Sequence, residues 1–368
     1  MRTIRNSPNW ALILAFSLTL LGCEAADNAR ADAPTVKPLA VPAGATVSTV
    51  PNELPSWLIP NIGEAAEAYY GPDSEHLIAQ VQSPLAVKSP RGMSGFLTKT
   101  FTDAGTDVVL VNEKGWDACS YFFPDGKRLV WTSIKDNMSM PLGNWSDWRN
   151  YPQGAELYVS DRQGKNIQRL TNNQYYEAEV TVSPDGKWIV FGRMIDGNMD
   201  LWVMNSDGTN EKQITFTADD QEGAPYFLPD SETILYRAWK ASEYDQKPTP
   251  MTIYTIKRDG SDRKERTYTH DMNWAPYPAP DGRHFVFVRA ETPRNWEVYL
   301  GDLESKEIKR LTFDEGFDGF PSISPDGRKM VWTTSRSAGP DARFMSGLRL
   351  HVMDITSLGL GPKSGAQK

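Results

Sequence analysis

The sequence predicts an all-β protein, and within that class a six-bladed β-propeller whose blades are four-stranded antiparallel sheets. The first observation is a Pro-Asp-Gly or Pro-Asp-Ser turn that follows a short strand-like run and precedes an apolar one. It occurs six times, with its aspartates at Asp73, Asp125, Asp185, Asp230, Asp281 and Asp326. Successive aspartates lie 45 to 60 residues apart, within or just above the period of radially stacked four-stranded sheets. The second observation is that residues 51–355 contain no long stretch with a helical period.

The first 22 residues are typical of a secretory signal peptide and are excluded from the fold. Arg2 and Arg5 form a basic start, and the apolar run over residues 10–21 is too short to span a bilayer. The run ends in Leu20-Leu21-Gly22-Cys23, which resembles the lipobox of bacterial lipoproteins. That resemblance implies a lipid on Cys23 and, because Glu24 follows, release toward the outer membrane. Signal cleavage without lipidation is the alternative.

Composition restricts the partners of the processed chain. The sequence carries 47 acidic and 39 basic residues, a formal net charge of −8, and loss of Arg2 and Arg5 makes it −10. Such a charge argues against nucleic acid and against electrostatic attachment to anionic lipid. Membrane contact is therefore expected through the Cys23 lipid alone. With Cys23 as the anchor, Cys119 has no partner for an internal disulfide, and we expect a monomer stabilised by packing.

Domain organisation follows from a shift in composition. Residues 23–50 are rich in Ala, Pro, Asp and Thr and predict a flexible tether. Residues 51–358 are expected to form the propeller, and residues 359–368 a C-terminal tail. No second domain is expected.

The blade can be followed strand by strand in the third repeat. Residues 177–182, 188–191, 201–204 and 212–215 are four strand-like runs. The pair Asp207-Gly208 lies between the last two, where glycine supplies the positive φ of a tight hairpin.

The ends of the chain are predicted to meet in the last blade. The sixth repeat has a third strand over residues 348–355 but no fourth, and residues 57–59 have the spacing of the missing strand relative to Pro72. An N-terminal strand that completes the last blade would pair two open edges and close the ring.

These residues carry a family resemblance. The segment from Phe317 to Gly327, followed by Met330-Val331-Trp332 and Arg336, resembles the repeat of the TolB-type, WD-repeat-like β-propellers of bacterial envelopes. The resemblance extends over all six repeats. It implies the fold, but the same repeat also occurs in envelope scaffolds, in non-catalytic domains of peptidases and in polysaccharide lyases.

A ring of polar residues is predicted at one rim of the central channel. Seven residues before each turn proline the chain has an acid or an amide in five of six blades: Asp117, Glu177, Glu222, Asn273 and Asp318. If the blades are in register, like charges crowd there and favour a cation or a cationic ligand. His270, just before the first strand of the fifth blade, is expected at the same rim. The alternative is that each acid hydrogen-bonds backbone amides of a neighbouring blade.

A long insertion in the second blade is the other predicted binding surface. Between the strands at Trp131 and Leu157 it contains Trp145, Trp148, Arg149 and Tyr151. Aromatic and guanidinium groups can stack on a sugar or anchor a partner protein. The alternative is a loop that folds back over its own blade. Two shorter insertions, at residues 243–250 and 337–347, join the equivalent strands and are expected on the same face.

Signals of catalysis are few. The sequence contains no Gly-x-Ser-x-Gly nucleophile motif, and its four histidines include no His-x-x-x-His pair. Similarity to oligogalacturonate lyases would require a cluster of imidazoles around a metal, whereas only His270 is expected near the rim. No cofactor is predicted, although a divalent cation held by the rim carboxylates stays open.

Two functions of different class follow. The first is a lipid-anchored binding or scaffold module on the periplasmic side of the outer membrane. It would recognise a periplasmic protein or a cell-wall component through the channel mouth and the insertion loops. The alternative is a metal-dependent, polysaccharide-acting enzyme.

Overall fold

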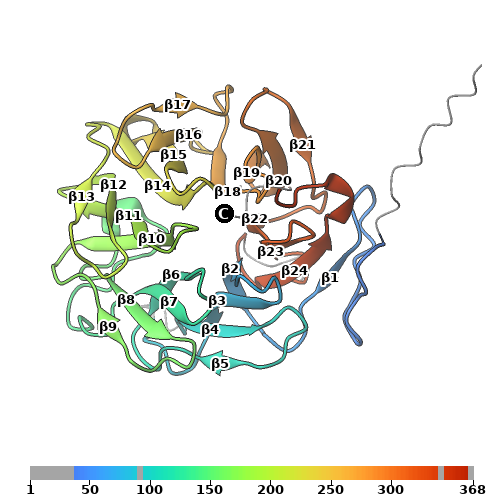
Figure 1. The fold of residues 1–368 in the computed structure, drawn as a ribbon, viewed down its shortest axis with the longest axis horizontal. Coiled ribbons are helices and arrows are strands. Elements are labelled where there is room, and N and C mark those ends of the chain that lie inside the picture. The colour runs from blue at the N-terminus through green and yellow to red at the C-terminus, as the bar shows by residue number, and fades with distance from the viewer. Residues whose placement is uncertain (1–36, 89–93, 339–343, 364–368) are drawn as a thin grey trace, which may run out of the picture. The chain divides into compact units, whose positions relative to one another are not determined.

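The computed structural model describes residues 37–88, 94–338 and 344–363, and the part from Pro38 onward forms one compact unit of six four-stranded antiparallel sheets. Figure 1 shows the sheets arranged around one axis, with the first strand of each blade innermost. The all-β, six-bladed propeller is therefore confirmed. In the described ranges, helix is limited to three short 3₁₀ segments, Trp148–Asn150, Ala241–Glu243 and Thr356–Leu358, and none could cross a membrane.

The six blades follow one another along the chain. The first three consist of β2 (Ala65–Tyr70), β3 (His76–Gln82), β4 (Phe96–Thr102) and β5 (Val109–Leu110); β6 (Asp117–Phe122), β7 (Arg128–Ser133), β8 (Glu156–Asp161) and β9 (Gln168–Arg169); and β10 (Tyr176–Val182), β11 (Trp188–Ile195), β12 (Asn198–Asn205) and β13 (Lys212–Gln213). The last three consist of β14 (Asp220–Phe227), β15 (Thr233–Lys240), β16 (Thr252–Lys257) and β17 (Lys264–Glu265); β18 (Asn273–Pro278), β19 (His284–Thr292), β20 (Asn295–Asp302) and β21 (Ile308–Arg310); and β22 (Asp318–Ile323), β23 (Lys329–Thr334), β24 (Arg349–Asp354) and β1 (Ser56–Leu58).

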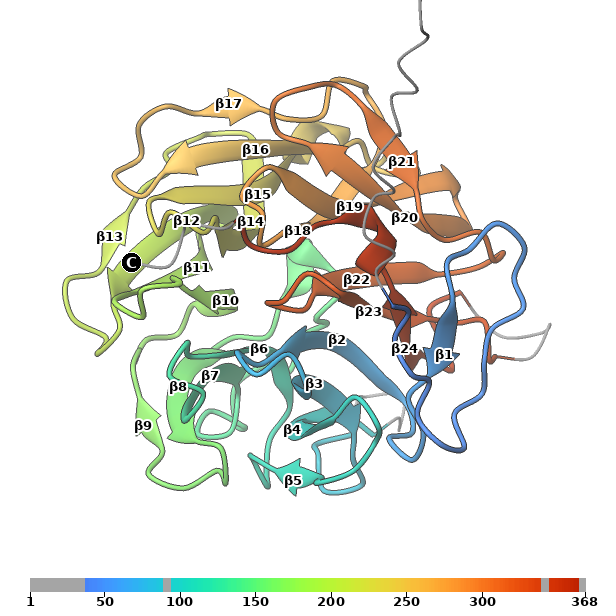
Figure 2. The ribbon, with the colours of Figure 1, turned by 45° about the vertical axis from the view of Figure 1, so that its right-hand side comes forward.

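The ring is closed by the N-terminal strand, as predicted. β1 pairs antiparallel with β24, with Trp57 opposite Val352, and so supplies the outer strand of the last blade. Figure 2 shows the two strands side by side. Trp57 is buried in an apolar cluster with residues of the first and sixth blades. The two ends of the propeller are thus joined by both hydrogen bonds and packing.

Part of the segment expected as a tether lies against the sixth blade. Val47 forms an isolated antiparallel bridge with Trp57, and the backbone N–H of Leu39 donates to Asp354 Oδ2 at 2.7 Å. Leu39 and Ala45 pack against the apolar cluster that contains Trp57. Within the described residues, the segment from Pro38 therefore belongs to the compact unit. The predicted signal peptide and Cys23 lie outside the described residues.

The repeated turns have an architectural role. The third turn residue has a left-handed backbone, with φ of 66° at Gly126 and 59° at Ser74, which glycine adopts most easily. The turn aspartate holds the next strand: Asp73 Oδ1 accepts from the backbone N–H of Glu75 at 3.0 Å and of His76 at 2.9 Å. These hydrogen bonds lower the pKa of Asp73.

Every innermost strand has an irregularity at the same place. The pairing register between the first and second strands shifts in all six blades. Five residues before each turn proline, a non-glycine residue has a positive φ between 36° and 57°: Glu67, Cys119, Glu179, Ala224, Ala275 and Phe320. Such bulges re-aim side chains at the rims of closed sheets. We call these six residues the bulge ring.

The end of the central channel nearest the turns is filled by side chains. Tyr69, Tyr121, Tyr226 and Tyr277 stand three residues before their turn prolines, and their hydroxyls meet in pairs. Tyr226 donates to Tyr69 at 2.7 Å, and the Tyr121 and Tyr277 oxygens lie 3.1 Å apart. Leu360, in the expected C-terminal tail, is buried in the same cluster.

Loss of the closing contact should destabilise the whole ring. We expect Trp57→Ala to reduce the free energy of unfolding by about 3–5 kcal/mol, the usual cost of removing a buried large aromatic side chain. Urea unfolding followed by far-UV circular dichroism measures it. Phe216→Ala, at an exposed aromatic residue, is the matched control and should change the value by less than about 0.5 kcal/mol. Equal midpoints for both variants and wild type would contradict this account of closure.

Candidate functional site

The predicted rim residues lie within the first three residues of the innermost strands, and their side chains enter the wall between blades. Asp117, Glu177, Glu222, Asn273 and Asp318 are 0–1% exposed. Asp117 Oδ2 accepts from the backbone N–H of Thr98, on β4 of the preceding blade, at 2.8 Å. Asn273 Nδ2 donates to the carbonyl of Met251, in the preceding blade, at 3.0 Å. Both contacts are hydrogen bonds to the backbone of a neighbouring blade, as in the alternative interpretation of the rim residues.

The buried acids differ in how their charge is compensated. Glu177 pairs with Arg193, and Asp318 Oδ2 accepts from Arg336 at 2.8 Å. Glu222 is hydrogen-bonded to Thr217 Oγ1 at 2.7 Å and forms no ion pair within the described ranges. Burial raises the pKa of Glu222 to about 8.

His270 lies apart from the rim acids. Its side chain is 68% exposed and its Nε2 is 3.7 Å from Glu243 Oε1. Within the described part of the chain, no group of three or more His, Cys, Asp or Glu side chains is placed to hold a metal ion. That the rim residues bind a ligand or a cation stays a prediction.

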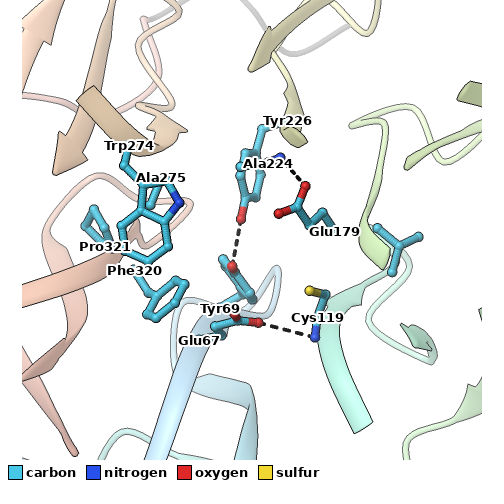
Figure 3. A pocket seen from close by; sticks show the side chains of 11 residues that line it. Glu67, Tyr69, Cys119, Glu179, Ala224, Tyr226, Trp274, Ala275, Phe320 and Pro321 are labelled. Carbon is cyan, nitrogen blue, oxygen red and sulfur yellow. Dashed lines mark hydrogen bonds between the residues drawn. The ribbon is translucent and has the colours of Figure 1, made fainter. Parts of the chain in front are cut away.

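The bulge ring, which the sequence interpretation missed, faces the channel instead. Glu67, Cys119 and Glu179 line a cavity of about 40 Å³ together with residues of the other blades, and Figure 3 shows them converging from different strands. One oxygen of Glu67 accepts from the backbone N–H of Cys119 at 3.2 Å. The cavity has room for a few water molecules at most. The available signal was a polar residue five positions before the turn proline in the first three blades.

The two channel carboxylates are in different electrostatic states. Glu179 accepts from the guanidinium of Arg237 at 2.9 Å and from the backbone N–H of Ala224 at 2.8 Å. Glu67 forms no ion pair with any described residue. Burial, together with the charge of Glu179, raises the pKa of Glu67 to about 7. Glu67 therefore titrates near neutral pH.

A much larger hollow lies over the mouth of this channel. It has a volume of about 600 Å³ and shares Glu67 and Phe320 with the small cavity below. We call it the mouth cleft. Its walls come from the first, second and sixth blades and include the acids Glu64 and Asp117. Among the residues that the structure describes, none that lines the cleft is Lys, Arg or His.

Besides the acids, the mouth cleft is lined by amide side chains and aromatic rings. The amide side chains include those of Gln80 and Gln82, and the aromatic ones Phe96, Trp116 and Trp145. The cleft thus offers hydrogen-bond acceptors, negative charge and π-faces on one surface.

The long insertion, residues 134–155, forms one wall of the mouth cleft. Of its predicted binding residues, Trp145 lines the cleft, with its ring edge-on to Tyr176 at a centroid distance of 5.8 Å. Tyr151 stacks on the same Tyr176 ring at 4.1 Å. The insertion therefore packs on the third blade as well as its own.

The other two predicted loop residues, Trp148 and Arg149, attach the insertion to the fourth blade. Trp148 packs edge-on against Trp239 at 5.3 Å, and the Arg149 guanidinium lies 4.7 Å from the ring centroid of Tyr244. Tyr244 belongs to the short insertion of the fourth blade. Met345, from the insertion of the sixth blade, lines the mouth cleft. The three insertions thus lie on one face, as expected.

The comparisons with known proteins agree with this architecture. Residues 151–306 match the family model described as the Tricorn protease N-terminal beta propeller domain. The chain is similar to an uncharacterized protein of Agrobacterium fabrum, with 27% identity over 75% of this chain and 86% of that protein.

Solved structures with a similar fold include a putative TolB and an oligogalacturonate lyase. The putative TolB from Agrobacterium tumefaciens superposes with a TM-score of 0.56, at 19% identity over 79% of this chain and 90% of the other. An oligogalacturonate lyase in complex with manganese gives 0.54, at 15% identity over 86% and 98%. Identities this low establish the fold and leave the function open. With its six four-stranded blades, the chain has a TolB-like β-propeller fold.

Proposed function

We propose that this protein is a non-catalytic binding module that takes a segment of a periplasmic protein into the mouth cleft. The observation that carries the proposal is the cleft itself, a hollow of about 600 Å³ walled by blade-insertion loops above the channel. Its volume is typical of ligand sites, which usually range over about 300–1,000 Å³. The lipobox-like sequence would anchor the module through Cys23 on the periplasmic side of the outer membrane.

The chemistry of the cleft supports a peptide-like ligand. Aromatic side chains such as Trp116 and Trp145 provide large contact area, and they dominate the energetics of many protein interfaces. The amides of Gln82 and Asn144 can each donate to and accept from a peptide backbone. A cell-wall component is the other outcome that a binding experiment can reveal.

The walls of the cleft are held before any ligand arrives. Tyr151 stacks on Tyr176, and Trp148 contacts the fourth blade, so the loop that carries Trp145 is packed at several points. A preformed site loses less conformational entropy on binding than a flexible one.

The binding surface can be located by site-specific photo-crosslinking. A photoreactive residue at Asn144, in the mouth cleft, should capture a defined partner in cells, and the same residue at Glu75, at the turn end of the first blade, should not. Trp145→Ala should weaken binding of the purified partner about tenfold or more, because central aromatic contacts typically contribute 2 kcal/mol or more.

Two results would contradict the proposed function. One is the capture of the same abundant envelope proteins from both positions. The other is an unchanged dissociation constant for Trp145→Ala in a correctly folded protein. Polysaccharide turnover that requires a metal and is abolished by chelator would instead favour the enzymatic alternative.

The buried rim acid Glu222 should affect stability without affecting this binding. Its pKa is about 8 in the folded protein against about 4.3 when unfolded, so the folded state retains a proton between these values. The contribution of Glu222 to stability should fall as pH rises from about 4 to 8 and change little above pH 8.

Glu222→Gln tests this linkage, because glutamine has nearly the same shape and does not ionise. The variant should be more stable than wild type by up to about 5 kcal/mol at pH 9, and equally stable near pH 4. Urea unfolding at several pH values measures the difference. A constant difference across the pH range would refute the predicted linkage, and a weakened partner complex would refute a purely structural role for Glu222.

A further inference from the structure

We propose that the partner inserts a basic side chain, a lysine ammonium or an arginine guanidinium, from the mouth cleft toward Glu67. This inference rests on the proposed function, because it names the chemical group that the cleft receives. It follows from four observations: an uncompensated carboxylate, its compensated counterpart in another blade, a buried acceptor without a donor, and the aromatic rings beside them.

Glu67 and Glu179 form a natural comparison, because both stand five residues before a turn proline and belong to the bulge ring. At Glu179 the charge is met by Arg237 of the next blade, with a nitrogen–oxygen distance of 2.9 Å. At Glu67 no described residue plays that part. The same fold position therefore has an internal cation in one blade and none in the other, and a partner's cation would complete the second.

The buried acceptor is the side-chain oxygen of Gln80. Gln80 is 4% exposed and lines the mouth cleft. Its Nε2 donates to Ser120 Oγ at 2.8 Å, while its Oε1 has no hydrogen-bond partner within the described residues. Buried polar atoms in native proteins are nearly always paired. An N–H donor of the ligand would satisfy Oε1.

The charge and rings of the mouth cleft favour the same class of ligand. Glu64 adds a carboxylate, and none of the lining residues in the described ranges is basic. Phe96, Trp116 and Trp145 provide π-faces that attract ammonium and guanidinium groups. The aliphatic stem of lysine or arginine can pack on these rings while its head reaches the acceptors.

Binding should be linked to the protonation of Glu67. The groups that face it are Tyr69 on its own strand, Cys119 on β6, Glu179 on β10 and Tyr226 on β14. In the free protein, burial keeps the pKa of Glu67 at about 7, and a neighbouring cation would lower it. A basic ligand should therefore bind more tightly as pH rises from 6 toward 8, by about tenfold, with little further gain above pH 8.

A charge-specific peptide tests the proposal directly. The probe is acetyl-Gly-Lys-Gly amide, and its control carries Nε-acetyl-lysine, which keeps the stem and removes the charge. Binding to the full chain is followed by tryptophan fluorescence and calorimetry at low salt. The lysine peptide should bind, with the pH profile given above, and the acetylated peptide should bind about tenfold more weakly or more.

Glu67→Gln should weaken the lysine peptide about tenfold or more, whereas Glu75→Gln, an acid at the opposite end of the same blade, should not. Folding of Glu67→Gln is expected, because glutamine can still accept from Cys119 and a buried charge is removed. The pH profile of the wild-type protein provides a second test that needs no variant.

The outcomes separate this inference from the proposed function. If both peptides bind equally, or neither binds, while Trp145→Ala still weakens the captured partner, the basic-group proposal is overturned and the binding module stands. If Trp145→Ala also leaves partner binding unchanged, both are overturned. Selective binding that is lost in Glu67→Gln and follows the predicted pH dependence supports the inference.

Discussion

The bulge five residues before each turn proline is the constraint on which the rest of this propeller depends. The inner edge of each sheet borders the axis, so the regular alternation of a strand points side chains into the interfaces between blades. The positive φ at the bulge interrupts that alternation and exposes one residue per blade to the channel. The acids two positions earlier are consequently left in the wall, where they are 0–1% exposed. Architecture and recognition thus use neighbouring positions on the same strands.

The placement of most inner-strand acids in the wall between blades explains why so acidic an interior is compatible with a stable fold. A buried carboxylate is costly unless it is paired, hydrogen-bonded or protonated. The wall uses all three means: Asp318 is paired with Arg336, Asp117 accepts a backbone N–H, and burial raises the pKa of Glu222. Glu67 differs because it lies at the boundary between the channel and a cleft that a ligand can reach. The positive charge that balances Glu67 can therefore come from a ligand.

The parts of this structure that the sequence predicts are those with local chemical causes. Pro-Asp-Gly turns require only four or five neighbouring residues, so their spacing gives the blade number, and the missing sixth-blade strand implies closure through Trp57. The direction of a side chain at Asp117 or at Cys119 depends on the bulge, and a shift of one residue moves a side chain to the opposite face. The mouth cleft was beyond prediction, because Gln80, Trp145 and Met345 come from three blades and meet only after the ring closes. Similarly, the composition of residues 38–50 indicates a tether and cannot reveal that Leu39 donates to Asp354.

The shape of the channel adds a constraint on how any ligand is recognised. Four tyrosines pack together at the end nearest the turns, so the described residues leave the mouth cleft as the approach to Glu67. The cavity below the cleft is about 40 Å³, which suits the head of one side chain better than a folded surface. Most of the contact must then be made in the cleft, whose walls belong to loops that vary from blade to blade. Such an arrangement separates two tasks. The loops select the surrounding sequence of the partner, and the carboxylate of Glu67 recognises one positive charge. Because both lie on a ring held closed by β1, a loss of closure would disturb selection and charge recognition together.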